Sequence, residues 1–228
     1  MTRLLLVVVL LVSATLVVNS CRRQSAAASE TLPAGASATP EERYVTGFTR
    51  VVLALPGQLD IVQNGTENVS VEAEAALLPE IQTRVQNDTL FIDTDAASFS
   101  ADTPPRFTVH VYQLTGLSVE GAGEVTAENL ELEDLDLSLD GAGSVTLDGE
   151  AQTLDVRLNG AGEVFAKGLE SGRVTLAVNG AGTAEVCASQ RLSAEVNGVG
   201  KVRYYGDPAE TDINVNGVGE VERAGGCG

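Results

Sequence analysis

One motif of the chain recurs six times at a nearly constant interval. Each copy joins two glycines through one small apolar residue, and the first glycine of the six pairs falls at Gly121, Gly141, Gly160, Gly180, Gly198 and Gly217. The intervals are therefore 20, 19, 20, 18 and 19 residues. A repeat of this length and regularity predicts stacked coils, each of which forms one turn of a β-solenoid.

The residues around the glycines fit stacking. Apolar residues before each motif would form a ladder inside the coils, and the polar position after the second glycine would point outward. The residue before the first glycine changes from acid to amide along the repeat: Glu120, Asp140, Asn159, Asn179, Asn197 and Asn216. Stacked amides can hydrogen-bond to their copies above and below. We expect each glycine pair to form a corner at which φ can be positive twice.

Two folds are compatible with the glycine repeat. Asn-Gly is also a strong signal for a two-residue hairpin, so an antiparallel meander with one hairpin per repeat is the alternative. Hairpins do not need the second glycine in every row, and the repeat therefore favours the solenoid. Alternating apolar segments before the repeat, such as Phe107–Tyr112, also predict strands, and no stretch has helical periodicity. The sequence predicts an all-β chain with about 18–20 residues per coil in its C-terminal half, and one domain over residues 44–228.

The start of the chain has the pattern of an export signal. Arg3 precedes an apolar run over residues 4–18, which is too short to cross a membrane comfortably. The segment ending in Asn19-Ser20-Cys21 resembles the lipobox of bacterial lipoproteins, in which the cysteine becomes the lipidated N-terminus. We therefore predict a signal peptide over 1–20, lipid attachment at Cys21, and a flexible linker over 21–43. Later cleavage near Ala26–Ala28 and an uncleaved anchor are the alternatives.

The amino-acid composition limits the kinds of partner that the protein can bind. The formal net charge is -18, which repels nucleic acid. Trp is absent and aromatics make up 4%, so a pocket of stacking rings is poorly supplied. His110 is the single histidine, and it falls within an alternating strand. The acidic run Glu128–Asp140 partly alternates with leucines, which indicates a solvated strand face in preference to a calcium site. We predict no catalytic, cofactor-binding or metal-binding residues.

Cys187 and Cys227 are the cysteines that remain after Cys21. An exported protein meets an oxidising exterior, which favours a disulfide between them. Their separation of 40 residues corresponds to two coils, or about 10 Å if both kept to one column, which exceeds the Cα limit for a disulfide. Gly225 and Gly226 would let the tail fold back. Bridged and unbridged states are both compatible with the sequence.

Residues 45–221 resemble the bacterial family called the putative autotransporter adhesin head, or head GIN, domain. The resemblance rests on the repeated [Asp/Asn]-Gly-Ala-Gly motif and on three earlier segments: Phe48–Val51, Gln58–Gln63, and Leu77-Leu78 through Thr89–Ile92. Later rows carry Val199 and Val218 in place of Ala. The resemblance implies a right-handed β-helix, often on exported proteins or lipoproteins, and it supplies no catalytic residues.

These patterns favour a non-enzymatic protein that is lipid-anchored to the bacterial outer membrane or cell surface. Such an adhesin or binding module would contact a protein or glycan through the solenoid flanks. One alternative is a polysaccharide-acting β-helix enzyme, which would gather Arg157, Arg173 and Arg191 with acids on one concave face. A second alternative is an envelope-stress sensor that binds a partner protein or a cationic peptide.

Overall fold

The computed structural model describes residues 38–96 and 99–227, within a compact unit that spans Ala36–Gly228. Every buried apolar residue in that part of the chain lies between Phe48 and Val202, so the unit contains its own core, as an independently folding domain does. The predicted signal peptide, Cys21 and most of the predicted linker lie outside the described residues. No helical segment in the described ranges is long and apolar enough to span a lipid bilayer.

The N-terminal boundary of the folded part differs from the prediction. Residues 38–43 form strand β1 (Ala38–Arg43), which pairs antiparallel with β4 (Asn68–Glu74). The guanidinium of Arg43 also donates to the backbone oxygens of Ile81 and Leu78, at 2.6 and 2.9 Å. The predicted flexible linker over 21–43 is therefore wrong for its last six residues, because these contacts hold them against the sheet.

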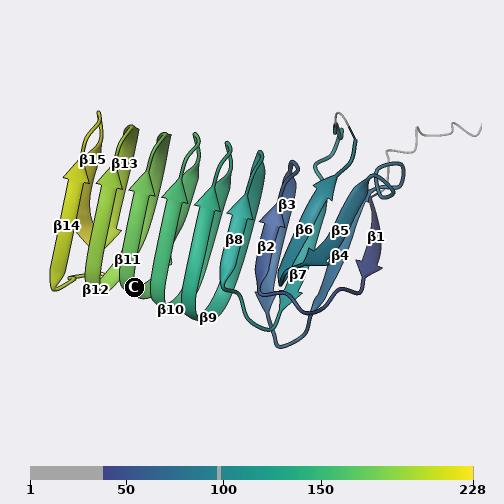
Figure 1. Ribbon diagram of the computed structural model, residues 1–228, viewed down its shortest axis with the longest axis horizontal. Helices are drawn as coiled ribbons and strands as arrows, with labels where there is room; N and C mark the ends of the chain where they lie inside the picture. Colours follow the sequence, from purple (N-terminus) through teal and green to yellow (C-terminus); the bar gives the residue numbers. More distant parts are fainter. Residues whose placement is uncertain (1–37, 97–98, 228) are drawn as a thin grey trace, which may run out of the picture. The chain divides into compact units, whose positions relative to one another are not determined.

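The described residues form an all-β fold, with a β-solenoid of about six turns in the C-terminal half, as predicted. The remaining early strands are β2 (Arg50–Leu53), β3 (Gly57–Gln63), β5 (Ile81–Gln86), β6 (Thr89–Thr94), β7 (Arg106–Val111) and β8 (Gly116–Val119). The later strands are β9 (Gly123–Leu139), β10 (Ser144–Leu158), β11 (Glu163–Val178), β12 (Ala181–Val196), β13 (Val199–Tyr205), β14 (Glu210–Val215) and β15 (Glu220–Gly225). Figure 1 shows the later strands side by side along the stack.

Parallel pairing aligns the repeats column by column. The residues that follow the second glycine are neighbours on successive coils: Glu124, Ser144, Glu163, Thr183, Lys201 and Glu220. The inner columns are apolar, and Leu137, Val156 and Leu176 are in register and at most 2% exposed. Because each ladder residue packs between its copies, the burial of apolar area is the main stabilising contribution along the stack. Register shifts within β10 and β11 mark the points where the long strands bend round this core.

The seam glycines are required for a different reason from the predicted one. None of the repeated Gly-x-Gly residues has a left-handed φ; the glycines with positive φ are Gly47, Gly65, Gly149, Gly206 and Gly225. Successive coils instead approach very closely along the seam. A Cβ added at Gly160 would lie 1.9 Å from the backbone oxygen of Gly141, and one at Gly198 would lie 2.0 Å from that of Gly180. The glycines therefore make room for the next coil, and the predicted positive-φ corner is wrong.

The predicted amide ladder is confirmed. Each Asn donates from Nδ2 to the Oδ1 atom of the residue one coil earlier, at 2.7 Å for Asn159 to Asp140, 2.9 Å for Asn179 to Asn159, 3.0 Å for Asn197 to Asn179 and 3.2 Å for Asn216 to Asn197. Asp140 can begin the ladder because it needs only to accept. From Asp140 onward, the change from acid to amide thus lets the column remain bonded without stacking like charges.

Replacing Asn179 by Ala removes two of these hydrogen bonds, one donated and one accepted. At a net value of about 0.5–1.5 kcal/mol per bond, we expect a loss of about 1–3 kcal/mol in the free energy of unfolding. Asn216→Ala is the matched control, because Asn216 makes a single ladder bond and its loss should be about half as large. Urea denaturation measures both. Equal losses in the free energy of unfolding for the two variants would contradict a contribution of the ladder hydrogen bonds to stability.

The stacking order of the N-terminal coils does not follow the chain. Strand β2 lies between β6 and β8, and β3 lies between β7 and β9, all in parallel register. The chain therefore passes over the coil formed by β2 and β3 when it runs from β7 to β8. Beyond β7 and β6, strands β4, β1 and β5 add in antiparallel direction and cover this end of the stack (Figure 1).

Candidate binding surface

A groove with a volume of about 1070 Å³ runs across several coils of the solenoid. We call it the carboxylate groove, because Glu131, Glu150 and Glu170 line it and occupy the same position on β9, β10 and β11. Parallel pairing sets neighbouring members of this column about 4.8 Å apart. All three side chains are exposed. The groove is therefore an open, negatively charged track on the flank.

One end of the carboxylate groove is formed by residues from the N-terminal coils. The Gln63 side chain pairs with the backbone of Glu131: it donates from Nε2 to the carbonyl oxygen at 3.1 Å and accepts from the N–H at 2.9 Å. The Gln63 amide thus makes the two backbone hydrogen bonds at Glu131 that a neighbouring strand would otherwise make. Tyr112 is also at this end and is 69% exposed, which makes it the largest apolar surface in the groove. Exposed tyrosines of this kind are common anchors in protein recognition.

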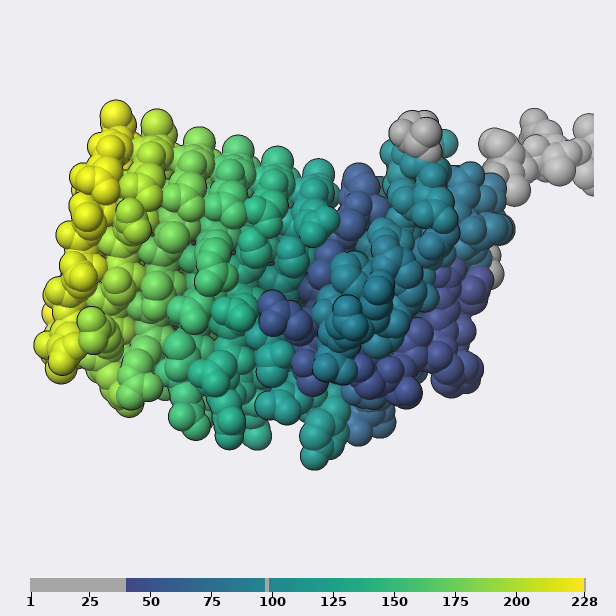
Figure 2. Space-filling model, in the orientation of Figure 1, coloured from purple at the N-terminus to yellow at the C-terminus, as the bar shows by residue number. Residues whose placement is uncertain are grey.

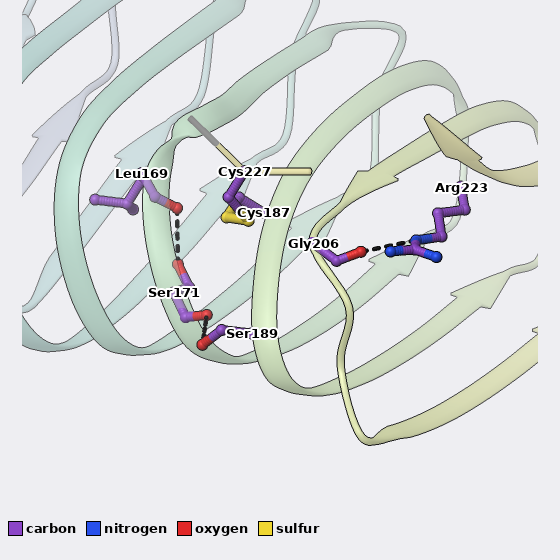
Figure 3. Close-up of a disulfide and its surroundings, with 7 residues drawn as sticks. All are labelled: Leu169, Ser171, Cys187, Ser189, Gly206, Arg223 and Cys227. Atoms are coloured by element: carbon purple, nitrogen blue, oxygen red, sulfur yellow. Dashed lines mark hydrogen bonds between the residues drawn. A yellow bond between two sulfur atoms is a disulfide. The ribbon is translucent and has the colours of Figure 1, made fainter. Parts of the chain in front are cut away.

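The other end of the carboxylate groove is closed by the disulfide between Cys187 and Cys227, whose Cα atoms are 5.6 Å apart (Figure 3). Cys187 is fully buried at the end of the first half of β12. After β15 the tail turns at Gly225, whose backbone oxygen accepts a hydrogen bond from the N–H of Gly206 at 2.8 Å. The tail therefore returns across the stack instead of continuing in its column. The column estimate of about 10 Å does not apply to it.

A second groove follows the glycine seam. It consists of two adjoining hollows of about 620 and 570 Å³ that share Ala181, Gly182 and Thr183. The second glycines form its floor, the central residues of the motifs form one wall, and the polar column forms the other. Toward the C-terminal coils the wall becomes more apolar, since Val199 is 61% and Val218 is 79% exposed. Figure 2 shows the coils that carry these grooves as parallel ridges.

Ion pairs connect the last three coils outside the carboxylate groove. Arg203 donates to Glu222 at 2.9 Å and to Glu185 at 3.1 Å, and Lys201 Nζ lies 3.0 Å from Glu222. The hydrogen bond with Glu222, followed by that with Glu185, raises the pKa of Arg203, and the hydrogen bonds from Arg203 and then Lys201 lower the pKa of Glu222. The predicted pair of Lys201 with Glu220 is present at 3.8 Å. These ion pairs thus engage the charged side chains of the last three coils with one another.

The arginines that the enzyme alternative required occupy two different columns of the coils. Arg173 and Arg191 are neighbours in register, and Nη1 of Arg191 lies 3.1 Å from Glu210. Of the three, only Arg173 lines the carboxylate groove. Arg157 belongs to another column, where its Nη1 atom lies 4.0 Å from Oδ1 of Asp136. The three arginines are therefore not gathered in a single column.

The remaining candidate groups lie apart from one another. Nδ1 of His110 lies 2.8 Å from Nδ2 of Asn64, and the acidic side chains of the Glu128–Asp140 run project outward from β9 between buried leucines. No three His, Cys, Asp or Glu side chains come together as metal ligands within residues 38–96 and 99–227. Sequence reasoning missed Gln63, the last residue of β3, and Tyr112, which follows β7, because both lie outside the repeat and reach the groove only through the coil order.

Comparison with known proteins gives one family. The family model described as "Putative auto-transporter adhesin, head GIN domain" matches residues 47–208. No curated protein matches the chain. A crystal structure of a putative adhesin from Bacteroides fragilis is similar with a TM-score of 0.67 and 23% identity, and the match covers 82% of this chain and 97% of that one. A putative adhesin from Parabacteroides merdae has 16% identity and a TM-score of 0.48, with coverage of 83% and 97%.

Proposed function

Since this chain belongs to the auto-transporter adhesin head GIN domain family, we propose that it is a non-enzymatic, exported surface protein that binds a protein or glycan partner through its solenoid flank. The observation that carries the proposal is the carboxylate groove, an open track with repeated side chains at the coil spacing. An extended partner can follow such a track over several coils. An enzyme would instead surround a small reacting centre.

The groove favours contact over its whole length. Carboxylates repeat along one side, Tyr112 supplies an apolar anchor at one end, and Arg173 supplies a cation near the other. Carboxylates accept hydrogen bonds from sugar hydroxyls and from backbone or cationic groups of a protein. Each contact contributes little, and several in register give useful affinity. The lipid anchor proposed at Cys21 would hold the groove outside the membrane.

The test uses binding of the compact unit Ala36–Gly228 to a glycan array and to immobilised extracellular matrix proteins. The groove variant replaces Glu131, Glu150 and Glu170 together by Gln, and Tyr112→Ala is a second, independent variant. Glu80→Gln is the matched control, because Glu80 is exposed and lies in the turn before β5, away from the groove. We expect at least a tenfold loss of binding for both groove variants and no loss for the control.

Two outcomes separate the alternatives. Binding by none of the glycans and matrix proteins, or equal binding by all variants, would contradict the proposal. Binding restricted to cationic peptides and abolished by salt would instead support the sensor alternative, since screening weakens contacts between exposed charges. Glycan cleavage during the array incubation would support the enzyme alternative.

A further inference from the structure

The two ends of the solenoid differ in whether further strands cover their outermost strand edges. At one end, the antiparallel strands β4 and β1 cover β7, and β5 covers β6. At the other end, β14 pairs only with β12 and β15 pairs only with β13, among the strands of the described residues. Figure 1 shows β14 and β15 as the last strands of the stack. Each of them presents a row of unpaired backbone groups, which is a template for a further strand.

Apolar side chains lie between these two edges. Ile213 is 41% exposed and Val215 is 39% exposed. Their neighbours in register on the preceding coil, Ala194 and Val196, are 2% and 0% exposed. The inner columns of the solenoid therefore reach the surface at this end, because no coil formed by residues 38–96 or 99–227 covers them. Covering them would bury apolar area as each earlier coil does.

We propose that this end binds the same end of a second copy of the chain, with β14 antiparallel to β14 of the second copy. A fitting partner must present two strand edges at the separation of β14 and β15, with an apolar centre between them. A single extended peptide can cover only one edge. The opposite end of another copy is covered by β1, which contains Pro40 and so lacks a donor. A two-fold arrangement of identical ends meets the requirement and closes on itself.

The side chains of β14 select one register. In an antiparallel two-fold pair centred on Ile213, that residue faces its own copy, Asp212 faces Asn214, and Glu210 faces Asn216. Each carboxylate then has an amide opposite it and can accept a hydrogen bond. A register centred on Asp212 would instead place the two Asp212 carboxylates opposite each other, and like charges directly opposite are destabilising. The edge is therefore self-complementary about Ile213.

The charge of the chain sets the salt dependence of this association. Each copy carries a formal net charge of -18, so two copies repel at long range. Salt screens that repulsion while it leaves the backbone and apolar contacts in place. Association should therefore strengthen when the ionic strength rises. A contact held by surface ion pairs would weaken instead.

The test measures the mass of Ala36–Gly228 by light scattering over a concentration series, at low and moderate salt. We expect twice the monomer mass for the unchanged protein. Ile213→Lys places a charge at the centre of the contact, and Thr211→Pro removes an N–H on the edge facing away from β12; both should remain monomeric. Val62→Lys is the matched control, because Val62 is 37% exposed on β3, within the stack, and this variant should still dimerise.

Cross-linking tests the register without relying on the stability of a variant. Residues opposite each other in antiparallel strands are close enough for a disulfide, so Ile213→Cys should give a covalent dimer on oxidation. Val62→Cys should not. A monomer at every concentration, a dimer that persists in Ile213→Lys, or open assemblies larger than two would each overturn the proposal.

Discussion

Replacing Gly160 by Ala is expected to destabilise the solenoid strongly. The added Cβ would lie 1.9 Å from the backbone oxygen of Gly141 and 2.8 Å from its carbonyl carbon. Both are backbone atoms, so the clash cannot be relieved by rotating a side chain, and two coils must separate along the seam. Overpacking of this kind costs about 1–3 kcal/mol and occasionally more, and we expect a loss at or above the top of that range. Urea denaturation of Ala36–Gly228 measures it.

Gly121→Ala is the matched control for the same substitution in the same motif. The coil before Gly121 carries Leu55 and Pro56 instead of a glycine pair, and the nearest atom to an added Cβ is 3.6 Å away. The φ of Gly121 is not left-handed. Ala there should be neutral or stabilising by about 0.4–1 kcal/mol, because it restricts the unfolded chain. Similar losses for the two variants would show that the seam does not depend on coil spacing.

Removal of the disulfide is expected to have a comparably large effect. The bond closes a chain segment of 40 residues, for which loop entropy predicts about 3–4 kcal/mol. It also fixes the tail that follows β15 to the fully buried Cys187. The double variant Cys187→Ala/Cys227→Ala should therefore lower the melting temperature. It should also raise amide hydrogen exchange in β13, β14 and β15, since a solenoid can fray from its end.

Reduction of the unchanged protein provides the comparison. It should reproduce the lower melting temperature of the double variant, and the double variant itself should not respond to reductant. Exchange in β9 and β10 should change little, because those strands lie several coils from the tail. An unchanged melting temperature and unchanged gel mobility after reduction would contradict a stabilising disulfide in the folded protein.

The features that repeat along the chain were the ones that could be predicted. The period of the glycine pairs predicted the length of each coil. The polar residues after the pairs form the column from Glu124 to Glu220. The amide ladder followed from the same reasoning, because identical positions one coil apart must be neighbours. In each case a physical requirement of stacking acts at every repeat, so it leaves a periodic trace in the sequence.

Features that occur once left no such trace. The placement of β2 between β6 and β8 depends on a crossing of the chain that no periodicity records. β1 was assigned to the linker because its sequence, with Pro40 and three charged residues, resembles a tether and not a buried strand. The role of the seam glycines was also misjudged, since an absent Cβ fits both a left-handed turn and a close approach of two backbones.

The candidate site was predicted only in general terms. A flank without a pocket follows from any solenoid, but the carboxylate groove also depends on Gln63 and Tyr112. Gln63 lies more than 60 residues before Glu131, and Tyr112 lies more than 15 residues before Glu128. Their arrival beside the repeat is a consequence of the coil order. The disulfide likewise depends on the turn at Gly225, which takes the tail out of its column.

The stacking of successive coils is tested most directly by cysteine pairs in one outward column. Ser144 and Glu163 are neighbours in register, at a spacing of about 4.8 Å that suits a disulfide, whereas Ser144 and Thr183 are two coils apart. Mild oxidation should therefore join Ser144→Cys to Glu163→Cys and leave Ser144→Cys and Thr183→Cys unjoined. Failure of the first pair to form, or ready formation of the second, would contradict the stacked-coil account.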